Sequence, residues 1–540
     1  MSKQRTENFM QGTLILSLAS ILVKVIGALF TIPLSNLYGA DGTAIFTKAY
    51  NVYATMYTVS SVGLPVAVAK IVAEANALGK EKEVRKIGRV ALATFLTLGL
   101  ALSGCMIFGI DVIVWFFDEN CRYAALAVAP TLFLTCVVSA FRGYYQGHGN
   151  MFPTAISQVI EAMGKLLFGL SLATWLMARE YPLEIVVAGA IGGVTLGTLF
   201  SAVFMVLRRL WDSRRETPFA ELPGRCHRSS TVFRKLMALA VPITISTSIM
   251  SVTNLIDSGM VVKRLVNGCG MQLNDANHLF GVLSMAQKIF NLPQTVIACI
   301  GVSVIPAISA AMALQQRKKT RKLVESGLRL TGLMAFPCAV GLGLMAHPVL
   351  GMLYYNQPAD AAAAAPLLQE FSIAVIGVAF VSITGSILQS LGKVNIPVRN
   401  TFIGGAIKLV ANYILVGIPA IGIHGAPIGT ILCQGSIALL NLLAIRRCGI
   451  RFSPRRCFFL TGLSAVAMGV FVALAYPGLS GVLGTTGLMG ILSAFGVIGM
   501  AVVLYFALLV VFRALPYEDI MMLPKGAHIA KWMKMEKEAE

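Results

Sequence analysis

Residues 389–408 read QSLGKVNIPVRNTFIGGAIK, and residues 146–165 read QGHGNMFPTAISQVIEAMGK. Both stretches begin with Gln, carry Gly three residues later and Pro shortly afterwards, and end in Lys. The Gln, Gly and Lys positions align at one constant offset of 243 residues. A fixed internal offset indicates a repeated structural unit. The chain therefore repeats one pattern, and each copy places a lysine (Lys165 or Lys408) inside a strongly apolar run.

A second, weaker echo lies earlier in each half. SSVGLPVAVAKIVAEA at 60–75 resembles ACIGVSVIPAISAAMA at 298–313, around Pro65 and Pro306, at an offset of 241 residues. The two offsets nearly agree, so the repeat extends over most of each half.

The composition is typical of a membrane protein. Hydrophobic residues make up 56% of the 540 residues and charged residues 13%, and the mean hydropathy is +0.77. Soluble domains carry about 25% charged residues. Apolar runs of the length needed to cross a ~30 Å hydrocarbon core as helix recur along the chain, without the alternation expected of barrel strands. The sequence therefore predicts an all-α polytopic membrane protein.

Fourteen membrane-spanning helices are expected from these apolar runs. They fall near residues 13–33, 43–68, 88–110, 122–146, 155–178, 183–207, 236–262, 279–305, 325–346, 366–391, 398–417, 423–445, 457–476 and 489–513.

Basic residues crowd alternate loops, although the net charge of +20 at first suggests nucleic-acid binding. The basic loops lie at 70–89, 208–235, 317–329 and 446–456, whereas the loops between them are nearly free of Lys and Arg. This is the positive-inside pattern. It predicts a multi-pass protein of the bacterial cytoplasmic (inner) membrane with both termini in the cytoplasm. The basic loops then contact anionic lipid head groups, and no nucleic-acid partner is expected.

The spans divide into two similar sets and a remainder. Six precede the basic loop at 208–235 and six follow it, so both sets enter the membrane from the same side. Parallel repeats of this kind are related by an axis along the membrane normal, with substrate sites between them. We predict two parallel six-helix lobes around a central cavity. The expected domains are residues 1–235, residues 236–450, and residues 451–540 with two extra helices and a cytoplasmic tail.

Charged side chains within the predicted spans are candidates for function, because a charge in hydrocarbon is costly and usually faces a cavity or a partner. The seven are Lys24, Lys48, Glu161, Lys165, Asp257, Lys288 and Lys408. Five cations against two anions predict a positive interior that attracts an anion such as phosphate or pyrophosphate. We therefore expect Lys24, Lys48, Lys288 and Lys408 to bind an anionic head group.

Structural explanations compete with this interpretation. Glu161 and Lys165 are four residues apart on one helix face and are expected to pair. The repeat places Gly404 where the first copy has Glu161, so Lys408 lacks this partner one turn earlier and is freer to meet a ligand. For Lys408 the alternatives are pairing across helices and snorkelling to an interface. Snorkelling also competes for Lys48, near the outer end of its helix.

Other intramembrane positions carry open alternatives. Asp257 is expected to pair with a lysine, bind a cation or carry a proton. A further set interrupts helices or lies in the repeated turn, and such backbone is tolerated where it lines a cavity or bends. The members of this set, for which an ordinary proline kink is the alternative, are Pro65, Asn291, Pro293, Pro306 and Gln389.

Motifs of catalysis and cofactor binding are missing from the sequence. It contains no G-x-x-x-x-G-K-[ST], no H-E-x-x-H and no C-x-x-C, and its six histidines are dispersed. We therefore expect no enzyme activity, no metal site and no cofactor.

Several short stretches resemble a known family. They are IPLSNLYGADG (32–42), AYNVY (49–53), GLPVAVAKIVAE (63–74), PITISTSIMSVTNLID (242–257), NLPQT (291–295), VIPAISAA (304–311), LQSLGKVNIPVRN (388–400), IKLVANYILV (407–416) and GIHGAPIGT (422–430). Together they resemble the stage V sporulation protein B and polysaccharide-export branch of the multidrug/oligosaccharidyl-lipid/polysaccharide exporter superfamily. Lipid II flippases of this superfamily carry basic cavity residues on the first, second and eighth helices, which here are lysines (Lys24, Lys48 and Lys288).

The resemblance implies alternating access around a V-shaped cavity and a substrate carried on undecaprenyl pyrophosphate, such as lipid II or a related lipid-linked saccharide. The expected role is peptidoglycan, spore-cortex or polysaccharide assembly, with membrane lipids and cell-wall synthesis proteins as partners. Three alternatives stay open: a cation-coupled drug antiporter of the same superfamily, a non-transporting scaffold of an envelope-synthesis complex, and a membrane glycosyltransferase. An antiporter would favour acidic cavity residues, for which Asp257 is thin support.

Overall fold

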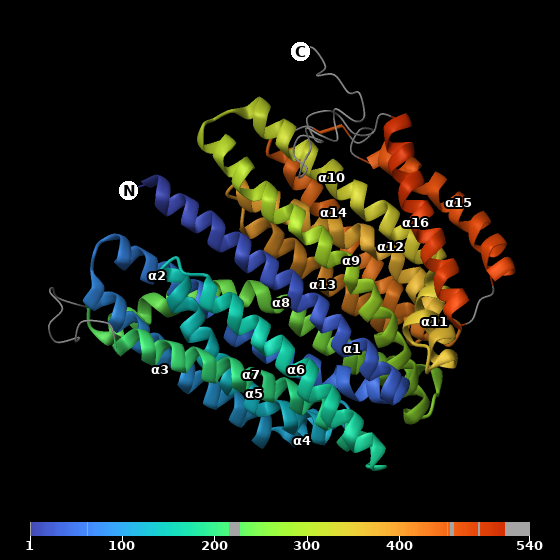
Figure 1. The fold of residues 1–540 in the computed structure, drawn as a ribbon, viewed down its shortest axis with the longest axis horizontal. Helices are drawn as coiled ribbons and strands as arrows, with labels where there is room; N and C mark the ends of the chain where they lie inside the picture. The colour runs from blue at the N-terminus through green and yellow to red at the C-terminus, as the bar shows by residue number, and fades with distance from the viewer. Residues whose placement is uncertain are drawn as a thin grey trace. The chain divides into compact units, whose positions relative to one another are not determined.

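The computed structural model describes residues 2–61, 63–214, 227–450, 452–453, 458–483 and 487–512 (Figure 1). Throughout these residues the regular structure is helical, and no strand occurs among them. The all-α membrane architecture predicted from the apolar runs is confirmed.

The first half of the chain forms seven α-helices and one 3₁₀ turn. They are α1 (Ser2–Ser61), α2 (Gly63–Ala77), α3 (Glu81–Phe108), α4 (Ile110–Phe116), η1 (Glu119–Cys121), α5 (Arg122–Gly147), α6 (Phe152–Ala178) and α7 (Leu183–Arg214).

The second half also has seven α-helices and one 3₁₀ turn, and it adds two helices. Its elements are α8 (Ser229–Cys269), α9 (Leu273–Ala313), α10 (Arg317–Leu344), α11 (Ala346–Leu353), α12 (Pro358–Ser390), α13 (Asn395–Leu415), η3 (Gly422–His424), α14 (Gly425–Arg447), α15 (Leu460–Leu483) and α16 (Gly487–Val511).

The number of membrane-spanning helices in the structure differs from the fourteen expected from the apolar runs. Within the described residues, ten helices are long and apolar enough to cross a membrane, or eleven if the bent helix α8 is one span. The single helix α1 holds the first predicted span and much of the second, joined at Gly39, where φ is +65°. The short helices α4 and α11 were not predicted, because seven or eight residues cannot fill a membrane-length apolar window. Sixteen helices are therefore described, and the count of fourteen spans is not confirmed.

The repeat seen in the sequence is visible in the packing. A short helix follows the third long helix in each half, as α4 after α3 and as α11 after α10. The next three helices then pack on one another in the same pairs, α5 with α7 and α6 with α7, and α12 with α14 and α13 with α14. The two halves therefore share one fold.

The two stretches that open with Gln form the same turn. Gly149 and Gly392 both have positive φ, +78° and +75°. Their N–H groups donate to the carbonyls of Gln146 and Gln389 at 2.9 and 3.0 Å, and the next N–H reaches five residues back at 3.0 and 2.8 Å. This glycine-based helix end satisfies carbonyls that the helix leaves open, so the repeated Gly is required by backbone conformation.

By packing, the chain divides into two compact units. Unit 1 comprises Met1–Val266 and Met271–Ser284, and unit 2 comprises Asn267–Gly270 and Met285–Glu540. Unit 1 thus includes most of α8 and the start of α9, which the sequence repeat assigns to the second lobe. The domain boundaries predicted at 235 and 450 follow the repeat, and they stay a prediction.

Helices α6 and α7 of unit 1 touch through their backbones. A Cβ on Gly193 would lie 2.1 Å from the Cα of Gly169, and one on Gly197 would lie 2.6 Å from the N of Lys165. Glycines four residues apart allow this close approach between helices in membranes. The contact fixes the face of α6 that carries the charged side chains described below.

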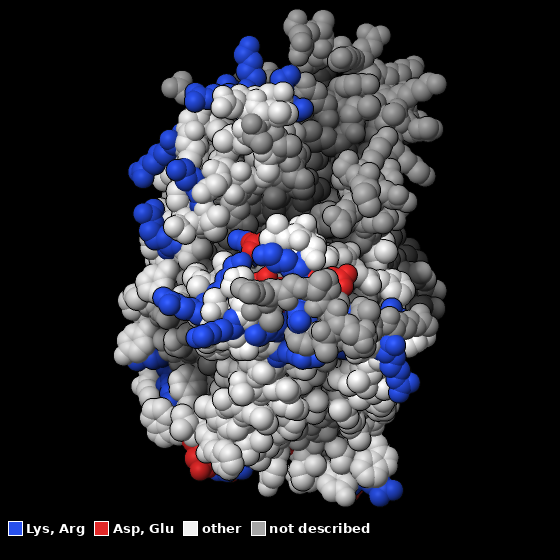
Figure 2. All heavy atoms as spheres, turned by 90° about the vertical axis from the view of Figure 1, so that its left-hand side faces the viewer, with Lys and Arg blue, Asp and Glu red and all other residues white. Residues whose placement is uncertain are grey.

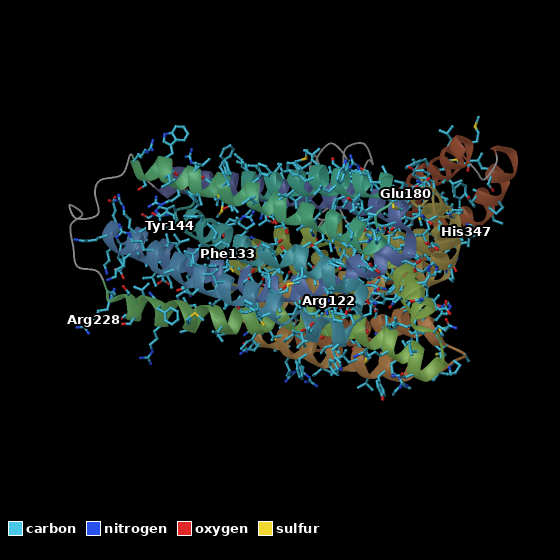
Figure 3. The ribbon with its side chains drawn as sticks, turned by 90° about the horizontal axis from the view of Figure 1, so that it is seen from below. Arg122, Phe133, Tyr144, Glu180, Arg228 and His347 are labelled. Atoms are coloured by element: carbon cyan, nitrogen blue, oxygen red, sulfur yellow. The ribbon has the colours of Figure 1, made fainter. Side chains whose placement is uncertain are left out.

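Basic residues of unit 1 gather at one end of its helices. Figure 2 shows Lys and Arg concentrated on this face with few Asp or Glu beside them. Lys235 on α8 pairs with Glu74 on α2 at 2.9 Å, so these helix ends meet there. In Figure 3, Tyr144 and Arg228 lie toward this end, and Arg122 and Glu180 lie toward the other. The arrangement matches the charge pattern from which the cytoplasmic face is predicted.

Replacing Gly392 by Ala should lower stability by about 1 kcal/mol, because a side chain at positive φ is strained. A Cβ there would meet no atom within 4 Å, so the backbone effect acts alone. The measurement is the thermal melting temperature of the purified protein. The matched control is Gly499→Ala, where a Cβ also has open space but the backbone is helical. Equal melting temperatures for the two variants would contradict the turn assignment.

Candidate functional site

Lys48 lies in a closed polar cluster of unit 1. Its side chain is 1% exposed, and its Nζ donates to a carboxylate oxygen of Asp118 and, at 2.5 Å, to Oδ1 of Asn277. The amine also lies 6.0 Å from the centroid of the Phe280 ring. Lys48 therefore does not snorkel in this structure; its charge is neutralised by a carboxylate on the segment between α4 and η1.

The Asp118 carboxylate is satisfied on both oxygens. One accepts from Lys48, and the other accepts from Sγ of Cys121 at 3.4 Å. Asp118 has an extended backbone between the two short helices, which turns its side chain inward. The short unpredicted helix α4 thus positions the counter-charge of Lys48.

A second ion pair connects α5, α6 and α7. Arg142 Nε donates to Ser157 Oγ at 2.9 Å, and its Nη2 donates to Glu161 Oε2 at 2.9 Å and to Ser201 Oγ at 3.5 Å. The Arg142 side chain is 10% exposed and that of Glu161 is 22% exposed. This partly buried pair keeps some access to its surroundings, unlike the Lys48 cluster.

Glu161 therefore takes a partner other than the predicted one. Within the described residues no ion pair joins it to Lys165; it binds Arg142, whose guanidinium satisfies Ser157 as well. The half-buried Lys165 instead points at α1, where a Cβ on Gly27 would lie 3.9 Å from its Nζ. The Arg142 fork engages several acceptors at once, which a lysine four residues away on the same helix does less well.

Lys24 is exposed on α1 and lies one turn before Gly27 on the same helix face. Within the described part of the chain it has no hydrogen-bond or ion-pair partner. Lys24 on α1 and Lys165 on α6 consequently both lie near Gly27, where α1 and α6 meet. With the Arg142–Glu161 pair one turn away from Lys165, these groups form what we call the α1–α6 charge row: Lys24, Lys165, Glu161 and Arg142.

Aromatic rings line the neighbouring part of α1. Phe46, Tyr50, Tyr53 and Tyr57 follow one another with centroid separations of 5.7, 5.5 and 5.7 Å. Phe46 and Tyr53 are buried in the core of unit 1, whereas Tyr50 is exposed.

The predicted cations of unit 2 are arranged differently. Lys408 is buried in α13, with 6% of its surface exposed, and is engaged with neighbouring groups. Lys288 on α9 is partly exposed and likewise engaged. The structure thus does not leave Lys408 as free as the missing glutamate at Gly404 suggested. The head-group role of all four lysines stays a prediction.

Unit 2 has its own cross-link between the corresponding helices, and it is uncharged. Asn400 Nδ2 on α13 donates to Asn441 Oδ1 on α14 at 2.8 Å, and Asn441 Nδ2 donates to Thr384 Oγ1 on α12 at 3.1 Å. Asn400 occupies the repeat position of Ser157. One layer of the repeated fold is therefore ionic in unit 1 and neutral in unit 2.

The predicted hinge residues occupy varied surroundings. Pro65 is buried in α2, where its carbonyl lies 2.8 Å from a Cβ built on Gly143 of α5. Pro293 is partly exposed within α9, and beside it Gln294 Nε2 donates to Asn291 Oδ1 at 3.0 Å. Helix α9 continues through Pro293, so the backbone there keeps its helical path.

Three further predicted residues complete the set. Pro306 lies within α9, but its side chain is outside the described residues. Gln389 is exposed, and its carbonyl accepts in the repeated turn. Asp257 is buried in α8, 6% exposed, and is engaged with neighbouring groups. A hinge or ion-binding role for any of them stays a prediction.

Sequence reasoning missed Arg142, Asp118 and Asn277. Arg142 lies near the end of its predicted span, where a charge needs no partner, and Asp118 falls in a predicted outer loop. A usable signal existed on α6, because Ser157 and Glu161 are four residues apart and present acceptors on one face. That pattern indicates a donor on a neighbouring helix.

Asp118→Asn should destabilise the protein by about 3 kcal/mol, because it leaves the buried Lys48 ammonium without a counter-charge. Thermal or denaturant unfolding of the purified protein measures this loss. The combined variant Lys48→Met with Asp118→Asn should recover much of it, since no unpaired charge remains.

The matched control for Asp118 is Glu119→Gln, which breaks an exposed pair with Arg122 in the same segment. Exposed pairs contribute about 0–1 kcal/mol. A loss no larger in Asp118→Asn than in Glu119→Gln would show that the Lys48 pair is not buried in the working protein.

Comparison with known proteins identifies a family and several relatives of this chain. A family model described as polysaccharide biosynthesis protein matches residues 9–312. The chain is 26% identical over 490 residues to the lipid II flippase MurJ of Bacillus subtilis (strain 168), covering 87% of this chain and 88% of that protein. It is 24% identical over 444 residues to stage V sporulation protein B of the same organism, covering 82% and 84%.

Solved structures share the fold. A lipid II flippase MurJ in an inward closed conformation superposes with a TM-score of 0.68 at 14% identity, covering 95% of this chain and 99% of that one. An inward-facing multidrug resistance MATE family transporter of the MOP superfamily gives 0.67 at 15% identity, covering 80% and 98%. These likenesses confirm the resemblance proposed from the short sequence stretches.

Proposed function

We propose a function from the premise that this chain belongs to the polysaccharide biosynthesis protein family. It is a multi-pass membrane protein homologous to a lipid II flippase and to stage V sporulation protein B. On that basis we propose that it moves a saccharide linked to undecaprenyl pyrophosphate, lipid II or a related lipid, across the cytoplasmic membrane by alternating access. Its product would feed peptidoglycan, spore-cortex or polysaccharide assembly.

The observation that carries the proposal is the α1–α6 charge row. Lys24 is exposed on a membrane-spanning helix, and Lys165 lies half-buried beside it across the α1–α6 contact. Uncompensated cations at membrane depth mark an anion pathway. Lysine is a compact point charge that suits phosphate. The carboxylate of the row forms its ion pair with Arg142, which leaves Lys24 and Lys165 as the candidate ligands for phosphate.

The charge count suggests how the cycle resets. The pyrophosphate of the substrate would offset Lys24 and Lys165, so the loaded site would cross the membrane with little net charge. The empty site would return carrying two positive charges. A membrane that is negative inside favours that inward return by about 2.3 kcal/mol per charge per 100 mV. The prenyl tail would stay in lipid throughout.

Lys48 would bind a head group only in competition with its present partner, Asp118. Its amine is held by Asp118 and Asn277, so a head group would bind it only by displacing that carboxylate. We propose that Lys48 acts in one conformation of the cycle, while Lys24 and Lys165 make the first contact. Lys288 and Lys408 of unit 2 stay candidate ligands for an anionic head group. The membrane orientation proposed from the basic loops has both termini in the cytoplasm.

Depletion of the protein tests the function. In cells without a redundant flippase, depletion should decrease the lipid-linked saccharide exposed on the outer surface, measured by its accessibility to an added hydrolase or label. Unchanged exposure would reject flipping and favour a scaffold role. Loss of drug or cation exchange with unchanged lipid exposure would instead identify a drug antiporter.

Lys24→Gln and Lys165→Gln should each decrease lipid exposure about tenfold, since a charged hydrogen bond contributes about 1.5–3 kcal/mol. The matched control is Lys318→Gln, an exposed lysine at the start of α10. Protein amounts in the membrane are compared by immunoblot. Full activity of both variants would show that the α1–α6 charge row does not bind the substrate.

A further inference from the structure

Glu370 of unit 2 is an ionisable residue within a membrane-length helix. It belongs to α12, which is long and apolar enough to cross a membrane. Its side chain is 31% exposed. Leu367 and Ala374, one turn before and after it on the same helix face, are buried. A carboxyl group in such apolar surroundings is a candidate for function, because its charge is costly there.

The partner of Glu370 is His424, in the 3₁₀ turn that precedes α14. His424 Nδ1–H donates to Glu370 Oε1 at 2.7 Å. The other carboxyl oxygen, Oε2, is buried, and no described residue donates a hydrogen bond to it. Burying a carboxylate oxygen without a donor costs free energy. A proton on Oε2 would remove the negative charge that causes this cost.

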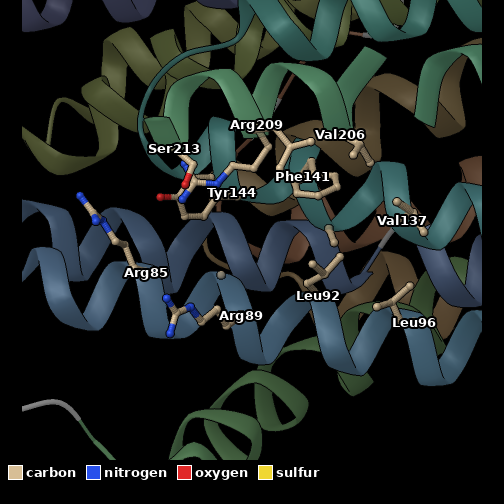
Figure 4. Close-up of a pocket in the computed structure, with 13 residues that line it drawn as sticks. Arg85, Arg89, Leu92, Leu96, Val137, Phe141, Tyr144, Val206, Arg209 and Ser213 are labelled. Atoms are coloured by element: carbon tan, nitrogen blue, oxygen red, sulfur yellow. The ribbon is translucent and has the colours of Figure 1, made fainter. Parts of the chain in front are cut away.

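The Glu370–His424 pair differs from the arginines of unit 1 that line the cavity in Figure 4. Arg85, Arg89 and Arg209 all interact with neighbouring groups, and Arg209 lies 4.8 Å from the centroid of the Tyr144 ring. Among the described residues, the side chains of Glu370 and His424 form no ion pair or hydrogen bond except the one that joins them. The pair can therefore gain or lose a proton without breaking another polar contact.

The pair lies at the end of α14 opposite to its basic residues. His424 directly precedes α14, whose last turn carries two arginines. The basic loops predict that the His424 end is the outer one. The His424 side chain is 42% exposed, so water can reach the pair at this end. Farther along the two helices, a Cβ on Gly377 of α12 would lie 2.8 Å from Cβ of Gln434 on α14, so the helices pack tightly on the inner side of the pair.

A proton suits this site better than a metal ion. One carboxyl oxygen lacks a donor, whereas metal ions such as Ca²⁺ take six or more oxygen ligands. No group of three or more His, Cys, Asp or Glu is placed to hold a metal ion within the part of the chain that the structure describes. Carboxyl and imidazole groups are also the components of proton relays in pumps and transporters.

We propose that Glu370, positioned by His424, binds a proton that drives the transport cycle. A proton from the outer side binds Oε2 of Glu370, while Oε1 keeps the hydrogen bond from His424. The carboxylate thereby becomes a neutral carboxylic acid, and it releases the same proton on the inner side after the carrier changes its access. Proton entry then favours the inward return of the empty carrier. The driving role rests on the proposed transport function, whereas the proton site does not.

Infrared difference spectroscopy of the purified full-length protein at successive pH values tests the proton site. Acidification should produce the carbonyl band of a protonated carboxylic acid, and Glu370→Gln should lose part of that band. The matched control is Glu180→Gln, an exposed glutamate in the turn after α6, which should keep the Glu370 part. An identical band in Glu370→Gln and the wild type would overturn the proton site. Loss of the Glu370 part when sodium chloride replaces choline chloride would also overturn it, because the carboxylate would then be a sodium ligand.

A second variant tests the positioning role of His424. His424→Gln keeps a donor for Oε1 but removes the ring that can carry a charge. The Glu370 part of the band should therefore appear at a different pH in this variant. The same pH in His424→Gln and the wild type would overturn the positioning role.

Transfer of purified lipid II in vesicles tests the driving role. With the membrane potential held at zero, a pH gradient that is acidic at the outer end should accelerate transfer by the wild type and by Glu180→Gln. Glu370→Gln should transfer lipid II at one rate with and without the gradient. A gradient response retained by Glu370→Gln would overturn the driving role. If the wild type moves no lipid II, the proposed function fails instead, and the infrared band still decides the proton site.

Discussion

The cost of an uncompensated charge in hydrocarbon governs the interior of unit 1. Unit 1 contains two different arrangements of charged side chains. Lys48 is neutralised completely by Asp118 within a closed cluster, whereas the α1–α6 charge row keeps more positive than negative groups and stays partly accessible. The second is consistent with an anion that completes the row when it binds.

The repeated fold makes the asymmetry of its two halves informative. The corresponding helices are joined by Arg142, Ser157 and Glu161 in unit 1, but by the amides of Asn400 and Asn441 in unit 2. Both arrangements link three helices, so linking the helices does not require charge. The ionic version adds charge that linking the helices does not need, which is consistent with the anion binding proposed above for the first half.

Much of the fold was predictable because its causes are local. Apolar runs placed the long helices, and the repeated Gly of the opening stretches indicated a repeated unit, in which Gly149 and Gly392 form the same turn at positive φ. Short helices such as α4 were not predicted, because they have too few residues to fill a membrane-length apolar window. The partners of the buried charges escaped for another reason: Asn277 lies 229 residues from Lys48, and only tertiary packing brings them together. Charge positions were thus predictable, and charge pairing was not.

The backbone contact between α6 and α7 limits how the charged side chains can move. At Gly169 and Gly193 the two helix backbones are in close contact, with no room for a side chain between them. Interiors packed this closely respond by moving whole elements and resist internal shear. Glu161 and Lys165 are therefore expected to move with α6 and α7 as one rigid pair of helices. A change in their exposure would come from other helices that move relative to this pair.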